Sequence, residues 1–108
     1  MYYTYMLRCT DNTIYTGITT DVKRRMTEHF TQNEKCAKYT KRHKPKKLEA
    51  VWSSQNRKEA SKLEYYLKHL NKHEKENLIK NNINLNILAD KIDVNEYRKI
   101  GIRRKFYG

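Results

Sequence analysis

The sequence predicts an α+β domain, and three patterns along the chain support that class. Residues 2–9 and 13–17 are rich in aromatic and β-branched side chains and are separated by turn-forming residues, which is typical of a β-hairpin. Apolar residues then recur at helical spacing over 21–32 and again over 57–70. A short β-patterned segment at 47–52 stands between the two helical stretches. With a further helix expected downstream, the predicted element order is β-β-α-β-α-α.

The length of the chain sets the expected domain count. At 108 residues the protein is large enough for one domain with a single modest core. No apolar run approaches the roughly 20 residues that a membrane helix requires, and the N-terminus lacks the basic and long apolar regions of a signal peptide. We therefore expect a cytoplasmic, monomeric protein without a membrane partner. Cys9 and Cys36 are too few for a disulfide framework and are expected to be reduced thiols.

The net charge is the strongest compositional signal. Twenty-four Lys and Arg against twelve Asp and Glu give a formal charge of +12, which predicts attraction to a polyanion, above all nucleic acid. The positive charge is dense over 35–47, which we interpret as a loop and which contains no acidic residue. The alternative is an ordinary solvated run of charge. The residues expected to contact nucleic acid in this basic segment are Lys35, Lys38, Tyr39, Lys41, Arg42, Lys44, Lys46 and Lys47.

The turn of the predicted hairpin decides which tyrosines share a face. Residues 10–13 are Thr-Asp-Asn-Thr, and an odd-numbered loop with Asn12 in the left-handed conformation pairs odd-numbered residues with odd-numbered ones. Tyr5 and Tyr15 then point to one face of the sheet. A two-residue loop would send them to opposite faces. We predict the odd loop or an equivalent bulge.

A strand-to-helix transition follows the hairpin and carries a polar constellation. Gly17 permits a sharp exit from the strand, and Thr20 or Asp21 is expected to cap the helix. Within the helix, Arg25 and His29 lie four residues apart on one row. This pair and a tyrosine of the preceding strand together form a candidate active site. The neighbouring row is expected to be buried and consists of Val22, Met26 and Phe30.

The second helical stretch carries one conspicuous acid. Asn56 or Ser54 is expected to cap this helix. Glu64 falls on the edge of its apolar stripe, where a carboxylate is costly unless it is paired or binds a metal. An ion pair with Lys68 at i+4 is the simpler interpretation. The apolar stripe itself consists of Ala60, Leu63, Leu67 and Leu70.

The C-terminal part of the chain is weakly patterned. We expect a helix over 72–81 and a short helix within 93–99. The tail at 98–107 is basic with interleaved aromatic residues. This composition is typical of a second nucleic-acid contact, and the alternative is a frayed chain end.

Taken in order, these residues resemble the GIY-YIG nuclease superfamily, specifically its small stand-alone members. The first family tripeptide corresponds to Tyr3-Thr4-Tyr5, in which only the final tyrosine is retained, and the second corresponds to Tyr15-Thr16-Gly17. The spacing from Asp21 to Arg25 and His29 also fits the family, as does the later pattern Glu59-Ala60-x-x-x-Glu64-x-x-Leu67-Lys68-x-Leu70. On this basis we assign 1–82 to a GIY-YIG-like nuclease domain, and 83–108 to a basic C-terminal extension that is not an independent domain.

The resemblance implies a three-stranded antiparallel sheet flanked by helices in a sandwich-like arrangement, the GIY-YIG nuclease fold. It also implies metal-dependent cleavage of a phosphodiester bond. By the same resemblance, Glu64 would hold a single divalent cation, Mg²⁺ or Mn²⁺, and Arg25 would contact the scissile phosphate. Tyr5 would act as the general base or position the attacking water, with Tyr15 and His29 beside it.

The chemistry of these residue types agrees with the implied roles. Mg²⁺ accepts one carboxylate and keeps several waters, and a guanidinium offers a fixed fork of donors to a phosphate. A phenol with an ordinary pKa near 10 is a poor base at neutral pH, whereas an imidazole with an ordinary pKa near 6.5 is well suited. The sequence therefore leaves open whether Tyr5 or His29 is the base.

We predict a metal-dependent endonuclease that hydrolyses phosphodiester bonds in DNA. Single strands and branched or damaged duplexes are the expected targets, and RNA stays open as a substrate. The alternative is a nucleic-acid-binding domain that uses the same scaffold without catalysis. A third interpretation is a basic protein whose charge serves protein partners.

Overall fold

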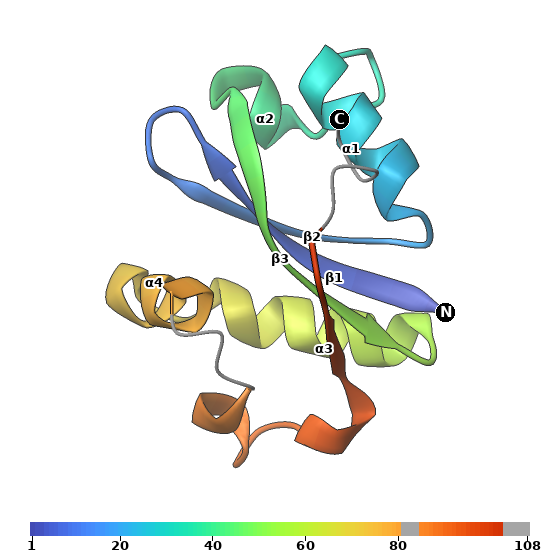
Figure 1. Ribbon diagram of the computed structural model, residues 1–108, viewed down its shortest axis with the longest axis vertical. Coiled ribbons are helices and arrows are strands. Elements are labelled where there is room, and N and C mark those ends of the chain that lie inside the picture. The colour runs from blue at the N-terminus through green and yellow to red at the C-terminus, as the bar shows by residue number, and fades with distance from the viewer. Residues whose placement is uncertain (81–84, 103–108) are drawn as a thin grey trace.

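The computed structural model describes residues 1–80 and 85–102, which form an antiparallel sheet with helices on both faces (Figure 1). This confirms the predicted α+β class. The sheet has four strands in the order β2-β1-β3-β4, so the expected number of three is wrong. The strands are β1 (Tyr2–Cys9), β2 (Ile14–Thr19), β3 (Pro45–Ser54) and β4 (Arg98–Ile100). The helices are α1 (Val22–Thr31), α2 (Lys38–Arg42), α3 (Arg57–Lys68) and α4 (Lys72–Lys80), with 3₁₀ turns at Asn86–Leu88 and Val94–Glu96.

The parity of the β1–β2 pairing is as predicted, although the bond from the Cys9 amide to the Thr13 carbonyl closes a loop at residues 10–12. Tyr5 pairs with Gly17, so odd-numbered residues face odd-numbered ones. Within the turn, the Asn12 amide donates to the Cys9 carbonyl, and Asn12 has a φ of 70°. This left-handed residue gives the loop its odd number of residues. Tyr5 and Tyr15 consequently lie on one face of the sheet.

The two faces of the sheet carry different helices and different cores. α1 and α2 cover one face, and α3 and α4 cover the other (Figure 1). Successive side chains of β1 point to opposite faces. Tyr5 and Leu7 therefore pack with Met26 of α1, whereas Met6 packs with Leu63 of α3. The α1 face, which holds Tyr5, is the one that concerns the site.

The fourth strand comes from the C-terminal part of the chain. Val51 of β3 pairs with Ile100 of β4. The sequence analysis missed this strand because three residues, of which two are charged, carry no readable alternation. The short helix expected within 93–99 is a 3₁₀ helix at Val94–Glu96, which precedes β4. Of the basic tail predicted at 98–107, residues 103–107 lie outside the described residues. The side chains that this part of the chain adds to the core are Leu85, Leu88 and Ile92.

The segment between α1 and α3 is more ordered than the sequence predicts. α2 lies inside the basic segment that was expected to be a loop, and β3 begins at Pro45 rather than Lys47. α1 begins after Asp21, whose carboxylate accepts a hydrogen bond from the Arg24 amide at 3.0 Å, so Asp21 is the capping residue. The division of the chain at residue 82 stays a prediction. Among the described helices, none combines the length and apolar character needed to cross a bilayer.

Candidate active site

Tyr5 lies at the centre of a polar cluster, on β1 opposite Gly17 of β2. Its side chain is fully buried in the core beneath α1. The absence of a side chain at position 17 makes this placement possible, because a Cβ there would lie 2.7 Å from the Tyr5 hydroxyl oxygen and 2.9 Å from Cε2 of Tyr15. Gly17 has no positive φ. The glycine is therefore required by the close approach of the tyrosine ring rather than by the backbone conformation.

A directed chain of hydrogen bonds starts at the Tyr5 hydroxyl. This hydroxyl lies 2.7 Å from Nε2 of His29, and Nδ1 of His29 lies 3.0 Å from Oγ1 of Thr40. Thr40 Oγ1 donates to the Ala37 carbonyl at 3.0 Å. Because a hydroxyl has one hydrogen and a carbonyl only accepts, Thr40 must accept the bond from the Nδ1–H of His29. We infer from this network that Nε2 carries the lone pair and that Tyr5 donates to it.

Arg25 also contacts the Tyr5 oxygen. Its Nε–H donates to that oxygen at 3.3 Å. Its Nη1 donates to the Glu28 carboxylate at 2.7 Å and to the Lys35 carbonyl at 2.8 Å. These bonds fix the plane of a guanidinium that is mostly buried, and they hold its positive charge beside the phenol.

Burial keeps both members of the Tyr5–His29 pair uncharged. Desolvation, reinforced by the positive charge of Arg25, lowers the pKa of His29 to about 4. Desolvation and the neighbouring Tyr15 raise the pKa of Tyr5 above its ordinary value, and the hydrogen bond from Arg25 offsets only part of this rise. At neutral pH the pair is consequently a neutral phenol that donates to a neutral imidazole.

A line of aromatic rings leads from this pair to the surface. Tyr15 packs edge-on against His29 with ring centroids 5.3 Å apart, and Tyr39 of α2 lies 5.5 Å from Tyr15. His43 stacks on Tyr39 at 4.3 Å. Tyr39 and His43 line an open cavity of about 580 Å³, whose other walls are Lys38, Lys41 and Arg42. The rings thus connect the buried pair with a basic surface.

The cations of the basic segment are exposed, and two other side chains of the segment anchor it to the rest of the site. The seven lysine and arginine side chains of 35–47 all face solvent. At one point His43 Nδ1 binds the carboxylate of Asp11 in the hairpin turn. At another, Thr40 of α2 accepts the bond from His29. The segment is therefore tied to both the hairpin and α1.

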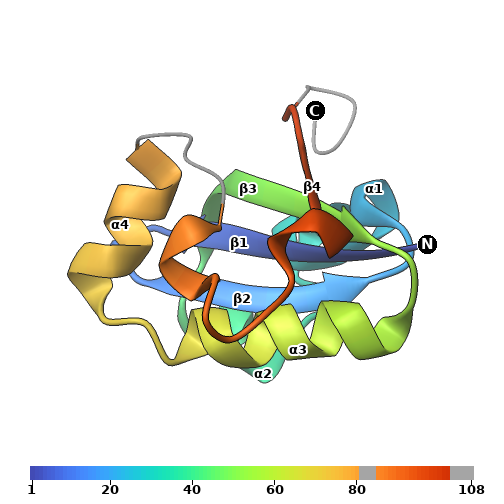
Figure 2. The same cartoon turned by 90° about the horizontal axis from the view of Figure 1, so that it is seen from below.

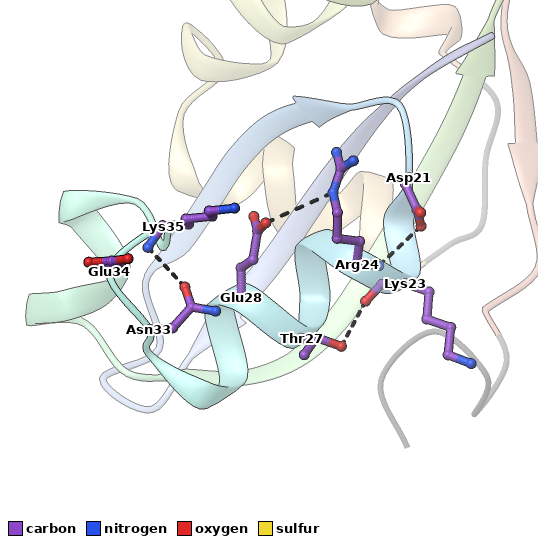
Figure 3. A pocket seen from close by; sticks show the side chains of 8 residues that line it. All are labelled: Asp21, Lys23, Arg24, Thr27, Glu28, Asn33, Glu34 and Lys35. Carbon is purple, nitrogen blue, oxygen red and sulfur yellow. Dashed lines mark hydrogen bonds and ion pairs between the residues drawn. The ribbon is translucent and has the colours of Figure 1, made fainter.

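A second hollow lies on the solvent side of α1 (Figure 3), and two of its lining residues, Glu28 and Lys35, are bonded to Arg25. It has a volume of about 570 Å³. Within it, Glu28 pairs with Arg24 at 3.9 Å and also with Arg25 at 2.7 Å. This carboxylate neutralises part of the positive charge, so the lining of the hollow carries both positive and negative charge. Its lining consists of Asp21, Lys23, Arg24, Thr27, Glu28, Asn33, Glu34 and Lys35.

Glu64 approaches the sheet from the face opposite α1. Its helix, α3, runs alongside β2, the edge strand that carries Tyr15 (Figure 2). One flank of α3 faces the C-terminal part of the chain, because the Tyr97 hydroxyl donates to the Glu59 carbonyl at 2.7 Å. Glu64 follows five residues later, roughly 140° around the helix axis. It therefore projects from the other flank, the one that faces the open edge at β2.

The Glu64 carboxylate has a weakly held partner that a metal ion could displace. Its side chain is 24% exposed and forms an ion pair at 3.4 Å with Lys68, which is half exposed. Such a surface pair contributes little free energy. Among the described residues, no group of three or more His, Cys, Asp or Glu side chains is placed to share a metal ion. A divalent ion would thus take one protein carboxylate and complete its shell with water and substrate oxygens, which Mg²⁺ does readily.

The structure brings four of the proposed catalytic residues together and sets the fifth apart. Tyr5, Tyr15, Arg25 and His29 form one cluster on the α1 face. Glu64 stands on α3 and makes the ion pair with Lys68 that the i+4 spacing predicts.

Two contributors escaped the sequence analysis. Glu28 has a signal that could have been used, since an acid three residues after Arg25 predicts an ion pair on a helix. Thr40 has none, because it sits in a lysine-rich stretch where nothing marks it as a partner of His29.

Comparison with known proteins identifies relatives along most of the chain. The family model described as the GIY-YIG catalytic domain matches residues 1–77. A UPF0213 protein of Fusobacterium nucleatum is 41% identical over 107 residues, which cover 97% of this chain and 98% of that protein. A UPF0213 protein of Halalkalibacterium halodurans is 44% identical over 78 residues, which cover 72% of this chain and 81% of that protein. The solution NMR structure of a UPF0213 protein from Bacillus halodurans is 37% identical, covers 86% of this chain and 98% of that one, and superposes with a TM-score of 0.49.

The matched span includes all five proposed catalytic residues and α1, α2 and α3. The similarity to the Fusobacterium protein continues through the C-terminal part of the chain. The chain therefore belongs to the GIY-YIG family, among the stand-alone UPF0213 proteins.

Proposed function

We propose that this protein is a metal-dependent endonuclease that hydrolyses phosphodiester bonds in DNA. Membership of the GIY-YIG family supports a nuclease-type activity on nucleic acid in general. The observation that carries the proposal is the chain of bonds from Arg25 through Tyr5 to His29. It joins a fixed cation, a hydroxyl that can relay a proton and a nitrogen that can receive one. Phosphodiester hydrolysis needs these three groups at the reacting atoms.

In the proposed mechanism Tyr5 relays a proton. Because the Tyr5 hydroxyl is fully buried, the side chains that cover it have to move aside when substrate binds. The attacking water then gives its proton to the Tyr5 oxygen as Tyr5 passes its own proton to Nε2 of His29, so no standing tyrosinate is needed. This agrees with the raised pKa of Tyr5 and with the lowered pKa of His29, which keeps Nε2 unprotonated. As negative charge builds on the phosphate, it opposes the field of Arg25 and makes the imidazole more basic. The leaving sugar oxygen takes up a proton from water, and the hydroxide so formed recovers the proton from Nε2 of His29 through Tyr5, which restores the site.

Arg25 is the proposed ligand for the scissile phosphate. Its bonds to Tyr5, Glu28 and the Lys35 carbonyl engage Nε and Nη1. The N–H groups on Nη2 are the proposed donors to a phosphate oxygen. Because the guanidinium is already oriented, its charge can stabilise the transition state without reorganisation.

Glu64 is the proposed ligand for Mg²⁺ or Mn²⁺. Its partly exposed carboxylate and its weak ion pair with Lys68 support this role. A bound divalent ion would supply positive charge to the phosphate and to the leaving oxygen. The flank of α3 that carries Glu64 faces the β2 edge, which is our proposed position for the phosphate.

The surroundings of the site favour a substrate with unpaired bases. Tyr39 and His43 are stacked beside three cations at an open cavity. Exposed aromatic rings next to basic side chains bind single strands, because each unpaired base can stack. Two observations favour the alternative of a binding domain without catalysis. Glu64 belongs to α3, which packs on the opposite face of the sheet from Tyr5, and its carboxylate is paired with Lys68.

The decisive experiment compares two variants of the same helix. Glu64→Gln removes the proposed metal ligand, whereas Glu59→Gln makes the same change on the flank that faces Tyr97. Labelled single strands and the matching duplex are incubated with Mg²⁺ or Mn²⁺ and then with chelator. We expect cleavage by the parent and by Glu59→Gln, loss of cleavage with chelator, and DNA binding without cleavage by Glu64→Gln. Binding without cleavage by the parent under all conditions would favour the non-catalytic alternative.

The same assay tests the substrate preference. We expect the single strand to be cut faster than the duplex. Faster cleavage of the duplex would contradict the role given to Tyr39 and His43 while leaving the chemistry intact.

A further inference from the structure

The side of α3 that faces away from the sheet is basic and aromatic. We call it the α3 outer face. The two acids of this helix lie on its flanks, where Glu59 is bonded by Tyr97 and Glu64 is paired with Lys68. The apolar stripe is buried on the sheet side and consists of Ala60, Leu63 and Leu67. The α3 outer face consists of Arg57, Lys58, Lys62, Tyr65, Lys68 and His69, all of which are exposed.

Tyr65 gives this face a fixed aromatic ring. It is 56% exposed, and in the described part of the chain only Met1 is a more exposed large hydrophobic side chain. Tyr66 contacts the ring edge-on at 5.1 Å, and His69 lies against it at 4.3 Å. His69 is itself held by a bond between its Nδ1 and the Tyr65 carbonyl at 2.7 Å. A ring that is fixed yet open to solvent is suited to stacking with a base.

The α3 outer face adjoins the proposed metal ligand. Arg57 and Lys68 project close to the flank that carries Glu64 and faces β2. From Arg57 to His69 the face extends about 18 Å along the helix axis, at 1.5 Å per residue. This length matches about five nucleotides of a stacked strand, at the spacing of roughly 3.4 Å that one strand has in B-DNA. The basic segment of 35–47 lies on the other side of the sheet (Figure 1), so the β2 edge separates two basic, aromatic surfaces.

We infer that the α3 outer face is a second nucleic-acid-binding surface. The nucleotides on one side of the scissile phosphate contact the basic segment, and those on the other side continue along α3. The scissile phosphate itself lies at the β2 edge. Phosphates pair with the cations, and one base stacks on Tyr65. The inference rests on the proposed function for the position of the phosphate, but binding to α3 can be measured without cleavage.

The first test removes two charges that do not touch Glu64. The double variant Lys58→Gln/Lys62→Gln is compared with Lys80→Gln/Lys91→Gln, which removes the same charge from exposed residues outside α3. Binding of a labelled single strand is followed by fluorescence anisotropy with chelator over a series of salt concentrations. Losing two phosphate contacts makes the slope of log affinity against log salt shallower by about 1.4, and affinity at 0.1 M salt falls roughly 20-fold. Equal effects in both double variants would overturn the inference, because they would reflect net charge alone.

The second test addresses the ring. Tyr65→Ala is expected to weaken single-strand binding roughly tenfold, and Tyr65→Phe is expected to retain it, because stacking needs the ring and not the hydroxyl. Unchanged affinity of Tyr65→Ala would overturn the stacking contact. Competition of phosphatidylserine vesicles with DNA, at equal phosphate concentration, would identify the face as a general anionic surface and would also overturn the inference.

Cleavage assays separate this inference from the proposed function. At limiting protein, Lys58→Gln/Lys62→Gln should cut more slowly than the parent, whereas Lys80→Gln/Lys91→Gln should cut at the parent's rate, because Lys80 and Lys91 lie outside the α3 outer face. A parent that binds through α3 but never cuts would contradict the proposed function alone. A parent that cuts, with the two double variants binding equally, would contradict the α3 surface alone.

Discussion

The Tyr5 hydroxyl donates to Nε2 of His29 across 2.7 Å, and the direction of this bond is set on the far side of the imidazole ring. Thr40 uses its own hydrogen on the Ala37 carbonyl, so it can only accept from Nδ1. A threonine that lies beyond the imidazole thus determines which nitrogen is free to receive a proton. We therefore expect the proposed catalysis to be sensitive to residues beyond those that would contact the phosphate.

Replacing Tyr5 tests the relay itself. Tyr5→Phe keeps the ring in the core but removes the hydroxyl between Arg25 and His29. We expect the cleavage rate to fall about 10²- to 10⁴-fold, the usual contribution of a general acid–base group. DNA affinity should not change. The free energy of unfolding should fall by about 1–3 kcal/mol, because a buried nitrogen loses its donor. Single-turnover kinetics and thermal denaturation measure the two effects, and a rate within twofold of the parent would remove Tyr5 from the mechanism.

Thr40 is expected to act as a positioning residue. Thr40→Val keeps the shape but leaves Nδ1–H of His29 without an acceptor, which favours the opposite tautomer. We expect roughly 100-fold slower cleavage, and recovery in Thr40→Ser, which retains the hydroxyl. Nitrogen chemical shifts of the imidazole, measured by NMR, report the tautomer directly. Parent-like shifts in Thr40→Val would show that another group orients the ring.

The buried imidazole gives stability a defined pH dependence. The pKa of His29 is about 4 in the folded chain and about 6.5 when unfolded, so the unfolded state binds more protons between these values. Stability is therefore fully present above pH 6.5 and is lost as pH falls toward 4, by about 2–3 kcal/mol. Urea denaturation at a series of pH values measures this loss. The His29→Gln variant should not show the part of the loss that comes from protonation of His29. A parent and variant with parallel pH profiles would contradict the burial of a neutral imidazole.

Gly17 should tolerate no side chain. In Gly17→Ala the new methyl group would meet the Tyr5 hydroxyl at 2.7 Å, and the ring is pinned by His29 and Arg25. Displacing the hydroxyl by an ångström should slow cleavage about 100-fold, and overpacking should cost about 1–3 kcal/mol of stability. Gly101→Ala is the matched control, because no atom of the described residues beyond its chain neighbours lies within 4 Å of a Cβ at that position. Equal behaviour of the two variants would contradict the tight contact.

The hairpin and the capped helices could be predicted because each depends on local chemistry. Asn12 in a left-handed conformation set the register, so the shared face of Tyr5 and Tyr15 followed from the turn alone. Asp21 and Asn56 both cap helices where the sequence places them. These features need no knowledge of distant residues.

The burial of His29 and the fourth strand depend on contacts that are remote in the sequence. The apolar row of α1 predicted a buried Phe30, yet His29 is fully buried and Phe30 is only partly so. His29 tolerates burial because Tyr5 and Thr40 satisfy both of its nitrogens, and neither partner is local. β4 likewise exists because β3 offers it an edge.

The position of β4 near the end of the described chain affects the order of events during synthesis. The last proposed catalytic residue, Glu64, leaves the ribosome well before Ile100 completes the sheet. At typical elongation rates the interval is a few seconds. During that time the hydrophobic surface around Trp52 lacks Leu88 and Ile92, which later cover it. A newly made chain therefore holds all its proposed catalytic groups while the part of the core beside α3 is still exposed to water.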